Sequence, residues 1–92
     1  MAQQCTVILG DPQKLADDLL AMGKEILEVE KTSSSGSFLV LSKTPAVAQS
    51  FDVISGDPEK LKTEINALIG GGKTIDLIIK TFSASHYVVV YR

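Results

Sequence analysis

The chain is poor in the residues on which catalytic and metal sites most often depend. Its 92 residues include one cysteine, Cys5, and one histidine, His86. A single cysteine excludes an intramolecular disulfide, and it excludes a metal site built from several cysteines. The histidine has neither a serine–acid context nor a second histidine at ligand spacing. Because no nucleophile, base and oxyanion donor come together, the sequence favours a non-enzyme without catalytic residues, metal or cofactor.

Basic clusters and long apolar runs are also missing. Nine Lys and Arg stand against eleven Asp and Glu, which gives a net charge of −2, and the basic residues are scattered. That distribution argues against a nucleic-acid partner. No apolar run approaches the ~18 residues of a membrane helix, and the start of the chain has no secretory signal pattern. We therefore expect a soluble protein in the cytoplasm, without a nucleic-acid or membrane partner.

The most informative feature that is present is an internal repeat. Residues 7–15 and 53–61 share seven of nine positions, at an offset of 46. The similarity resumes at an offset of 49 after a three-residue insertion, which pairs Gly23 with Gly72. Self-similarity of this kind indicates a duplicated structural unit. The sequence thus predicts a single domain, 1–92, made of pseudo-repeats 3–43 and 50–92 joined by a short linker, 44–49.

Each copy carries the same local signals. A strand runs into Gly-Asp-Pro, where Asp11 or Asp57 can cap a helix and proline suits its first turn. An amphipathic helix follows and ends at glycine, and two further strands are joined by a Ser-rich turn. The unit is therefore β-α-β-β. We expect an α+β two-layer sandwich, with a mostly antiparallel or mixed six-stranded sheet and both helices on one of its faces.

The last strand, 86–91, is apolar on both faces. Val88 and Val90 lie on one face, and Tyr87, Val89 and Tyr91 lie on the other, so neither face has the polar residues expected of a solvent-exposed face. Helices on one face of a sheet leave the other face uncovered, and in a short chain a second copy of itself is the simplest cover. The sequence therefore predicts a homo-oligomer. The residues expected at its interface are Phe82, Tyr87, Val89, Tyr91 and Ile78.

Gly70–Thr74 ends in Gly-Lys-Thr, as a phosphate-binding loop does. The motif needs a glycine where this chain has Ala67, and it must join a strand to a helix, whereas this segment does the reverse. A helix end followed by a basic residue explains it, and explains the other copy as well. If the protein binds a small anion, the candidate ligand-binding residues are Lys24, Lys73, Ser34, Ser35 and His86.

Two functions from different classes remain open. The first is a non-enzymatic cytoplasmic binding or protein-interaction module that acts as a homo-oligomer. The second is a protein that binds or sequesters a small molecule at the pseudo-twofold axis or between protomers. Features shared by the two copies have structural explanations, so function is expected where the copies differ.

Overall fold

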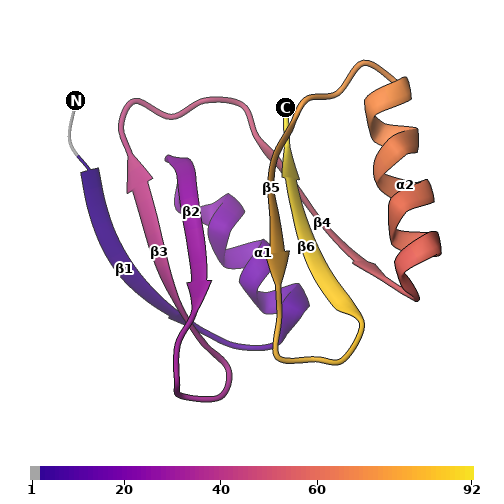
Figure 1. The fold of residues 1–92 in the computed structure, drawn as a ribbon. Helices are drawn as coiled ribbons and strands as arrows, with labels where there is room; N and C mark the ends of the chain where they lie inside the picture. The colour runs from indigo at the N-terminus through magenta and orange to yellow at the C-terminus, as the bar shows by residue number, and fades with distance from the viewer. Residues whose placement is uncertain (1–2) are drawn as a thin grey trace.

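The computed structural model describes residues 3–92 and confirms the α+β class and the duplicated unit (Figure 1). Repeat 1 and repeat 2 each run β-α-β-β. The elements of repeat 1 are β1 (Gln3–Leu9), α1 (Pro12–Ala21), β2 (Glu25–Lys31) and β3 (Ser37–Lys43). Those of repeat 2 are β4 (Ser50–Ser55), α2 (Pro58–Gly70), β5 (Ile75–Lys80) and β6 (His86–Tyr91).

Both helices begin as the Gly-Asp-Pro corners predict. The Asp11 carboxylate accepts a hydrogen bond from the Lys14 backbone N–H at 2.8 Å, and Asp57 makes the same cap with Lys60 at 2.9 Å. Gly10 is needed because its φ is +149° and a Cβ would lie 2.6 Å from the Lys14 side chain. Local sequence chemistry therefore fixes where each helix starts.

The predicted six-stranded sheet is wrong, because the strands form two antiparallel sheets of three. Sheet A has the order β1-β3-β2 and sheet B the order β4-β6-β5. The edge strands β2 and β5 contact each other without joining the sheets. The Gln49 side chain hydrogen-bonds the backbone at the edge of β2. Its amide oxygen accepts a hydrogen bond from the Ile26 N–H at 2.8 Å, and its amide nitrogen donates one to the Ile26 carbonyl at 3.3 Å. Those backbone groups are then satisfied without a neighbouring strand.

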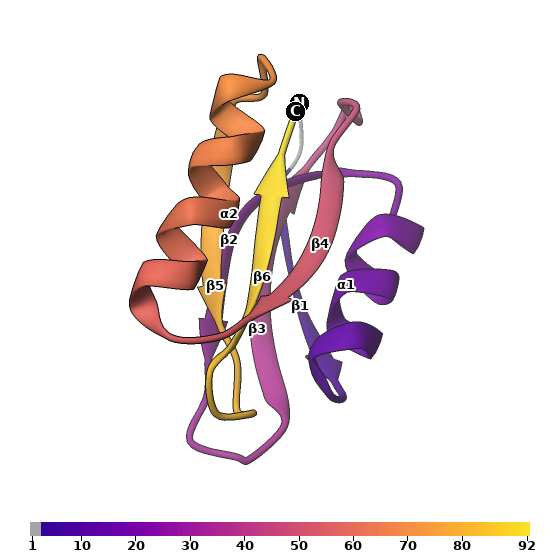
Figure 2. The same ribbon diagram turned by 90° about the vertical axis from the view of Figure 1, so that its right-hand side faces the viewer.

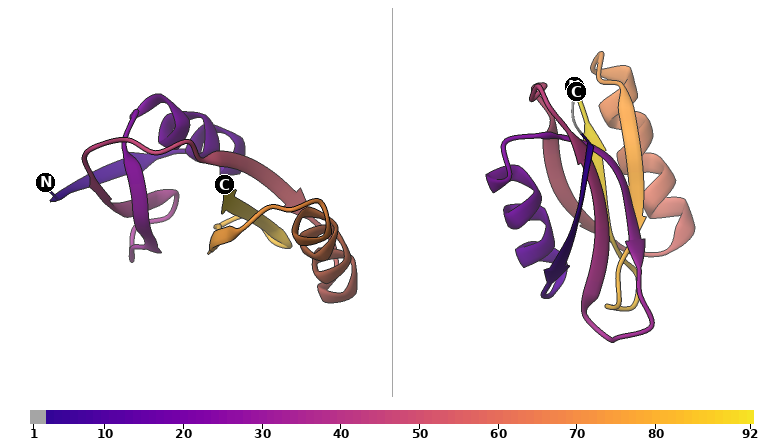
Figure 3. Two further views of the ribbon diagram at one scale, coloured as in Figure 1. Left: turned by 90° about the horizontal axis from the view of Figure 1, so that it is seen from above. Right: turned by 90° about the vertical axis from the view of Figure 1, so that its left-hand side faces the viewer.

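Helix α1 lies between the two sheets. It contacts β1 of its own repeat and β4 and β6 of the other repeat. Leu15 and Leu19 are fully buried, and Ala16 is almost so, in a core that includes residues of both sheets. Figure 3 shows an arch with α1 on its convex side, where sheet A and sheet B come together.

The two helices do not share one face of a sheet, which corrects the expected two-layer arrangement. Figure 2 shows α1 and α2 on opposite sides of β4 and β6. The cause is the two-sided apolar character of β6: Val88 and Val90 join the core around α1, while Val89 points to the face on which α2 lies. The order of layers is sheet A, α1, sheet B, α2.

Candidate functional site

The two lysines proposed as anion ligands lie at one end of the molecule. Lys24 directly precedes β2 and its ammonium donates to the Gln4 side-chain oxygen. Lys73 lies in the loop between α2 and β5 and is exposed. In Figure 1 both loops are at the top.

The serines and the histidine proposed with them lie at the other end, in the hairpin turns drawn at the bottom of Figure 1. Ser34 and Ser35 are exposed turn residues, and the Ser34 carbonyl accepts from the Ser37 N–H at 3.1 Å. His86 Nδ1 lies 2.8 Å from the Ala84 carbonyl oxygen within its own turn. The structure therefore does not bring the five candidate residues together around one ligand.

The carboxylates at the helix starts are engaged as caps, and no metal centre forms around them. Among residues 3–92 no group of three or more His, Cys, Asp or Glu side chains is arranged to hold a metal ion. Within the same residues, no helix is both long and apolar enough to cross a membrane.

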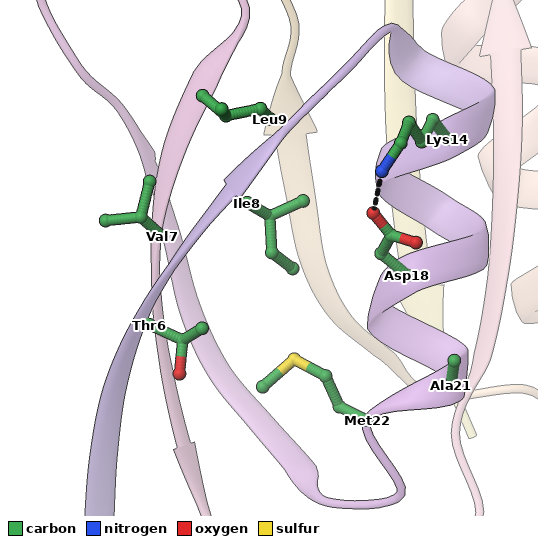
Figure 4. A pocket seen from close by; sticks show the side chains of 8 residues that line it. All are labelled: Thr6, Val7, Ile8, Leu9, Lys14, Asp18, Ala21 and Met22. Carbon is green, nitrogen blue, oxygen red and sulfur yellow. Dashed lines mark hydrogen bonds and ion pairs between the residues drawn. The ribbon is translucent and has the colours of Figure 1, made fainter.

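A groove of about 470 Å³ runs between β1 and α1 (Figure 4). Ile8 and Met22 project into the space between the strand and the helix. Its charged groups are Lys14 and Asp18, which neutralise each other in an ion pair of 2.6 Å. The residues that line it do not include a paired nucleophile and base.

Four of the five residues proposed for an interface share one face of sheet B. Tyr87, Val89 and Tyr91 alternate along β6, and Ile78 of β5 is the cross-strand partner of Val89. Val89 is fully buried, whereas Ile78 is 55% exposed, so this face is only partly covered within the chain.

Phe82, the fifth of these residues, lies elsewhere. Its ring packs edge-on against Phe38 with 5.4 Å between centroids, against the core that lies between the sheets. The Lys31 ammonium sits 4.6 Å from the Phe82 ring centroid, a cation–π contact. Phe82 therefore connects repeat 1 to repeat 2.

Tyr91 is tied to β4 by a hydrogen bond. Its hydroxyl donates to the Asp52 carboxylate at 2.6 Å. This hydrogen bond, helped by partial desolvation, raises the pKa of Tyr91 because ionisation would remove the donated proton and place two negative charges together. The contribution of the bond to stability is present below the pKa of the unfolded state and is lost as pH rises through the folded-state value.

We expect Asp52→Asn to shift the ionisation of Tyr91 toward its ordinary pH range, because an amide oxygen carries no charge to oppose the phenolate. An ultraviolet titration of tyrosinate formation measures this shift. Tyr91→Phe identifies the signal, since it deletes that ionisation. An unchanged titration in Asp52→Asn would show that the carboxylate does not hold the phenol proton.

The face of sheet A that points away from α1 is an exposed apolar surface, which we call the outer face. Val7 is 58% exposed, and its cross-strand partner Leu39 is 45% exposed. Cys5 and its cross-strand partner Leu41 continue the same face, and Leu9 at the end of β1 is 62% exposed. The sequence pattern did not single out this surface, because the large aromatic residues that mark an apolar face are in repeat 2.

Helix α2 is the second incompletely covered element, at the opposite end of the arch (Figure 3). None of its residues is buried, in contrast to α1, and its main contact is with β4. Leu61, Ile65 and Leu68 are half-buried, and Ile69 is 51% exposed. An amphipathic helix with an apolar stripe normally buries it, so α2 resembles a helix that lacks one of its two neighbours.

A polar network joins the repeats beside the C-terminus, at the top of Figure 1. Arg92 donates to Asp76 at 2.8 Å and to Glu25 of repeat 1 at 3.1 Å, and Gln49 donates to Asp76 at 3.0 Å. From the sequence, Gln49 was predicted only to lie in the short linker 44–49. One signal could have revealed its role: at the offset of 46, Gln49 aligns with another glutamine, Gln3.

Comparison of the chain with protein-family models, with curated proteins and with solved structures finds no match.

Proposed function

We propose that this chain is a non-enzymatic cytoplasmic interaction module that works as a homo-oligomer. The observation that carries the proposal is the pair of uncovered apolar surfaces at the two ends of the arch: the outer face of sheet A and helix α2. Contiguous exposed apolar surface on a small domain is typical of a protein–protein interface.

The size of the chain supports the same conclusion. Its total accessible surface is 5288 Å². A stable interface takes about 800 Å² from each partner. A domain of this length buries a modest core, so covering its exposed valines and leucines adds stability that the single chain lacks. The small-molecule alternative has no comparable support, because its candidate residues lie at opposite ends.

Sedimentation velocity over a wide concentration range tests the proposal. We expect one discrete species larger than the monomer at high concentration, and dissociation to the monomer when the protein is diluted. A chain that sediments as a monomer at high concentration, with unchanged behaviour on dilution, would contradict self-association. High salt serves as a control, since an assembly held mainly by apolar contact persists when charges are screened.

A further inference from the structure

The helix–sheet contact between the two repeats runs in one direction only. Helix α1 of repeat 1 packs on β4 and β6 of repeat 2, but α2 does not pack on sheet A in return. A contact that joins two different surfaces is heterologous, and such contacts can be repeated from one unit to the next. One chain has only two repeats and therefore makes this contact once. Helix α2 at one end and the outer face of sheet A at the other are left without a partner, and we call them the unused surfaces.

The unused surfaces are the repeat equivalents of the used ones. On sheet B, the residues that face α1 are buried or half-buried in the core. At the offsets of 46 and 49 their equivalents form the outer face of sheet A, where they are exposed or half-buried. The corresponding pairs are Val53 with Val7, Val88 with Leu39, and Val90 with Leu41.

The polar part of the internal contact is also duplicated. Gln49, directly before repeat 2, hydrogen-bonds the backbone of Ile26 on the edge strand of repeat 1. The equivalents are Gln3, which is exposed at the start of β1, and Ile75, which lies on edge strand β5 at a β-bulge like that beside Ile26. Gln3 of one chain is therefore placed to hydrogen-bond the backbone of Ile75 in another chain, as Gln49 does with Ile26.

Where the unused surfaces differ from the internal ones, their charges are complementary. Position 16 of α1 is alanine, and its equivalent on α2 is Lys62, whose ammonium pairs with Glu59 at the helix surface. On the sheet, Leu77 and Ile79 of β5 correspond to Glu28 and Glu30 of β2, which are exposed on the outer face. The helix surface therefore carries the Glu59–Lys62 ion pair and the sheet two acidic residues without an ion pair among residues 3–92, so Lys62 can exchange its partner for Glu28 or Glu30 when these two surfaces meet.

We infer that the protein assembles head to tail, with α2 of one chain packed on the outer face of sheet A of the next chain. The contact repeats the one that α1 makes with sheet B inside each chain. The inference rests on the proposed homo-oligomer and specifies its interface. The arch of the single chain bends toward one side, with α1 on its convex side (Figure 3). A heterologous contact that closes on itself generates a ring, which gives the single discrete species expected above.

Site-directed cross-linking tests this arrangement, because Cys5 is the only cysteine and lies exposed on the outer face. A second protein carries Cys5→Ser and Asn66→Cys, which moves the only thiol to the exposed surface of α2. The two proteins are mixed, allowed to exchange, and treated with a short bismaleimide. The reagent is calibrated on a chain with Cys5→Ser, Leu20→Cys and Phe51→Cys, which places thiols at the equivalent internal positions and should link within one chain.

We expect a covalent dimer in the mixture and little in either protein alone. Each protein and the mixture are sedimented before the reagent is added, so that formation of the mixed oligomer is observed directly. Efficient cross-linking of the unsubstituted protein with itself through Cys5 would overturn the head-to-tail contact in favour of packing between two outer faces. An oligomer that gives no mixed cross-link would also overturn it, while leaving self-association intact. A purely monomeric chain would instead overturn the proposed function.

Discussion

Replacing Leu19 with alanine is expected to lower the free energy of unfolding by about 3 kcal/mol. The Leu19 side chain is fully buried in the layer between sheet A and sheet B, where α1 contacts strands of both repeats. A cavity at that place cannot be filled by one sheet without moving the other. The cost therefore includes lost contacts on both sides of the helix. Urea unfolding followed by circular dichroism measures the change.

The duplication provides a matched control. Ile65 occupies on α2 the position that Leu19 occupies on α1, at the offset of 46, but it is only half-buried. Ile65→Ala should cost about 1 kcal/mol, because less apolar surface returns to water. Both variants are unfolded at several protein concentrations, so that a contribution from self-association appears as a concentration dependence. Equal losses at the two positions would contradict the burial of α1 between the sheets.

The elements themselves were predictable because their signals are local. Asp11 and Asp57 cap helices exactly one residue after a glycine that must take a positive φ, and both features can be read in the sequence. The Ser-rich turns likewise predict the two hairpins, since so short a connection between strands requires antiparallel pairing. Repetition of each signal in the second copy strengthened the prediction of a β-α-β-β unit.

The arrangement of the two repeats was not predictable, because it depends on contacts that no local signal encodes. One such contact is made by the Gln49 side chain, which hydrogen-bonds the backbone of Ile26 at the edge of β2, where a strand of the other repeat was expected. Similarly, the apolar faces of β6 indicated that both would be covered, but not that α1 of the other repeat covers one of them. The apolar surface left exposed was therefore on sheet A as well as on sheet B.

Replacing Leu39 with lysine is expected to raise the dissociation constant of the oligomer by roughly 30-fold or more. Leu39 lies on the central strand of sheet A, at the middle of the outer face, where residues usually contribute most to binding. In the proposed contact the new ammonium would be buried against α2, the helix that carries Lys62. In the free chain it faces Glu30 across the strands, which should preserve the fold.

The control for this substitution is Leu20→Lys. Leu20 is also a large, exposed apolar residue, at 62%, but it lies on α1, outside the proposed contact. Sedimentation of the two variants should show dissociation for Leu39→Lys alone, while thermal unfolding confirms that both remain folded. Because the two changes add the same charge to the same residue type, net charge cannot account for a difference. Dissociation by Leu20→Lys with an intact Leu39→Lys oligomer would place the interface on another face of the arch.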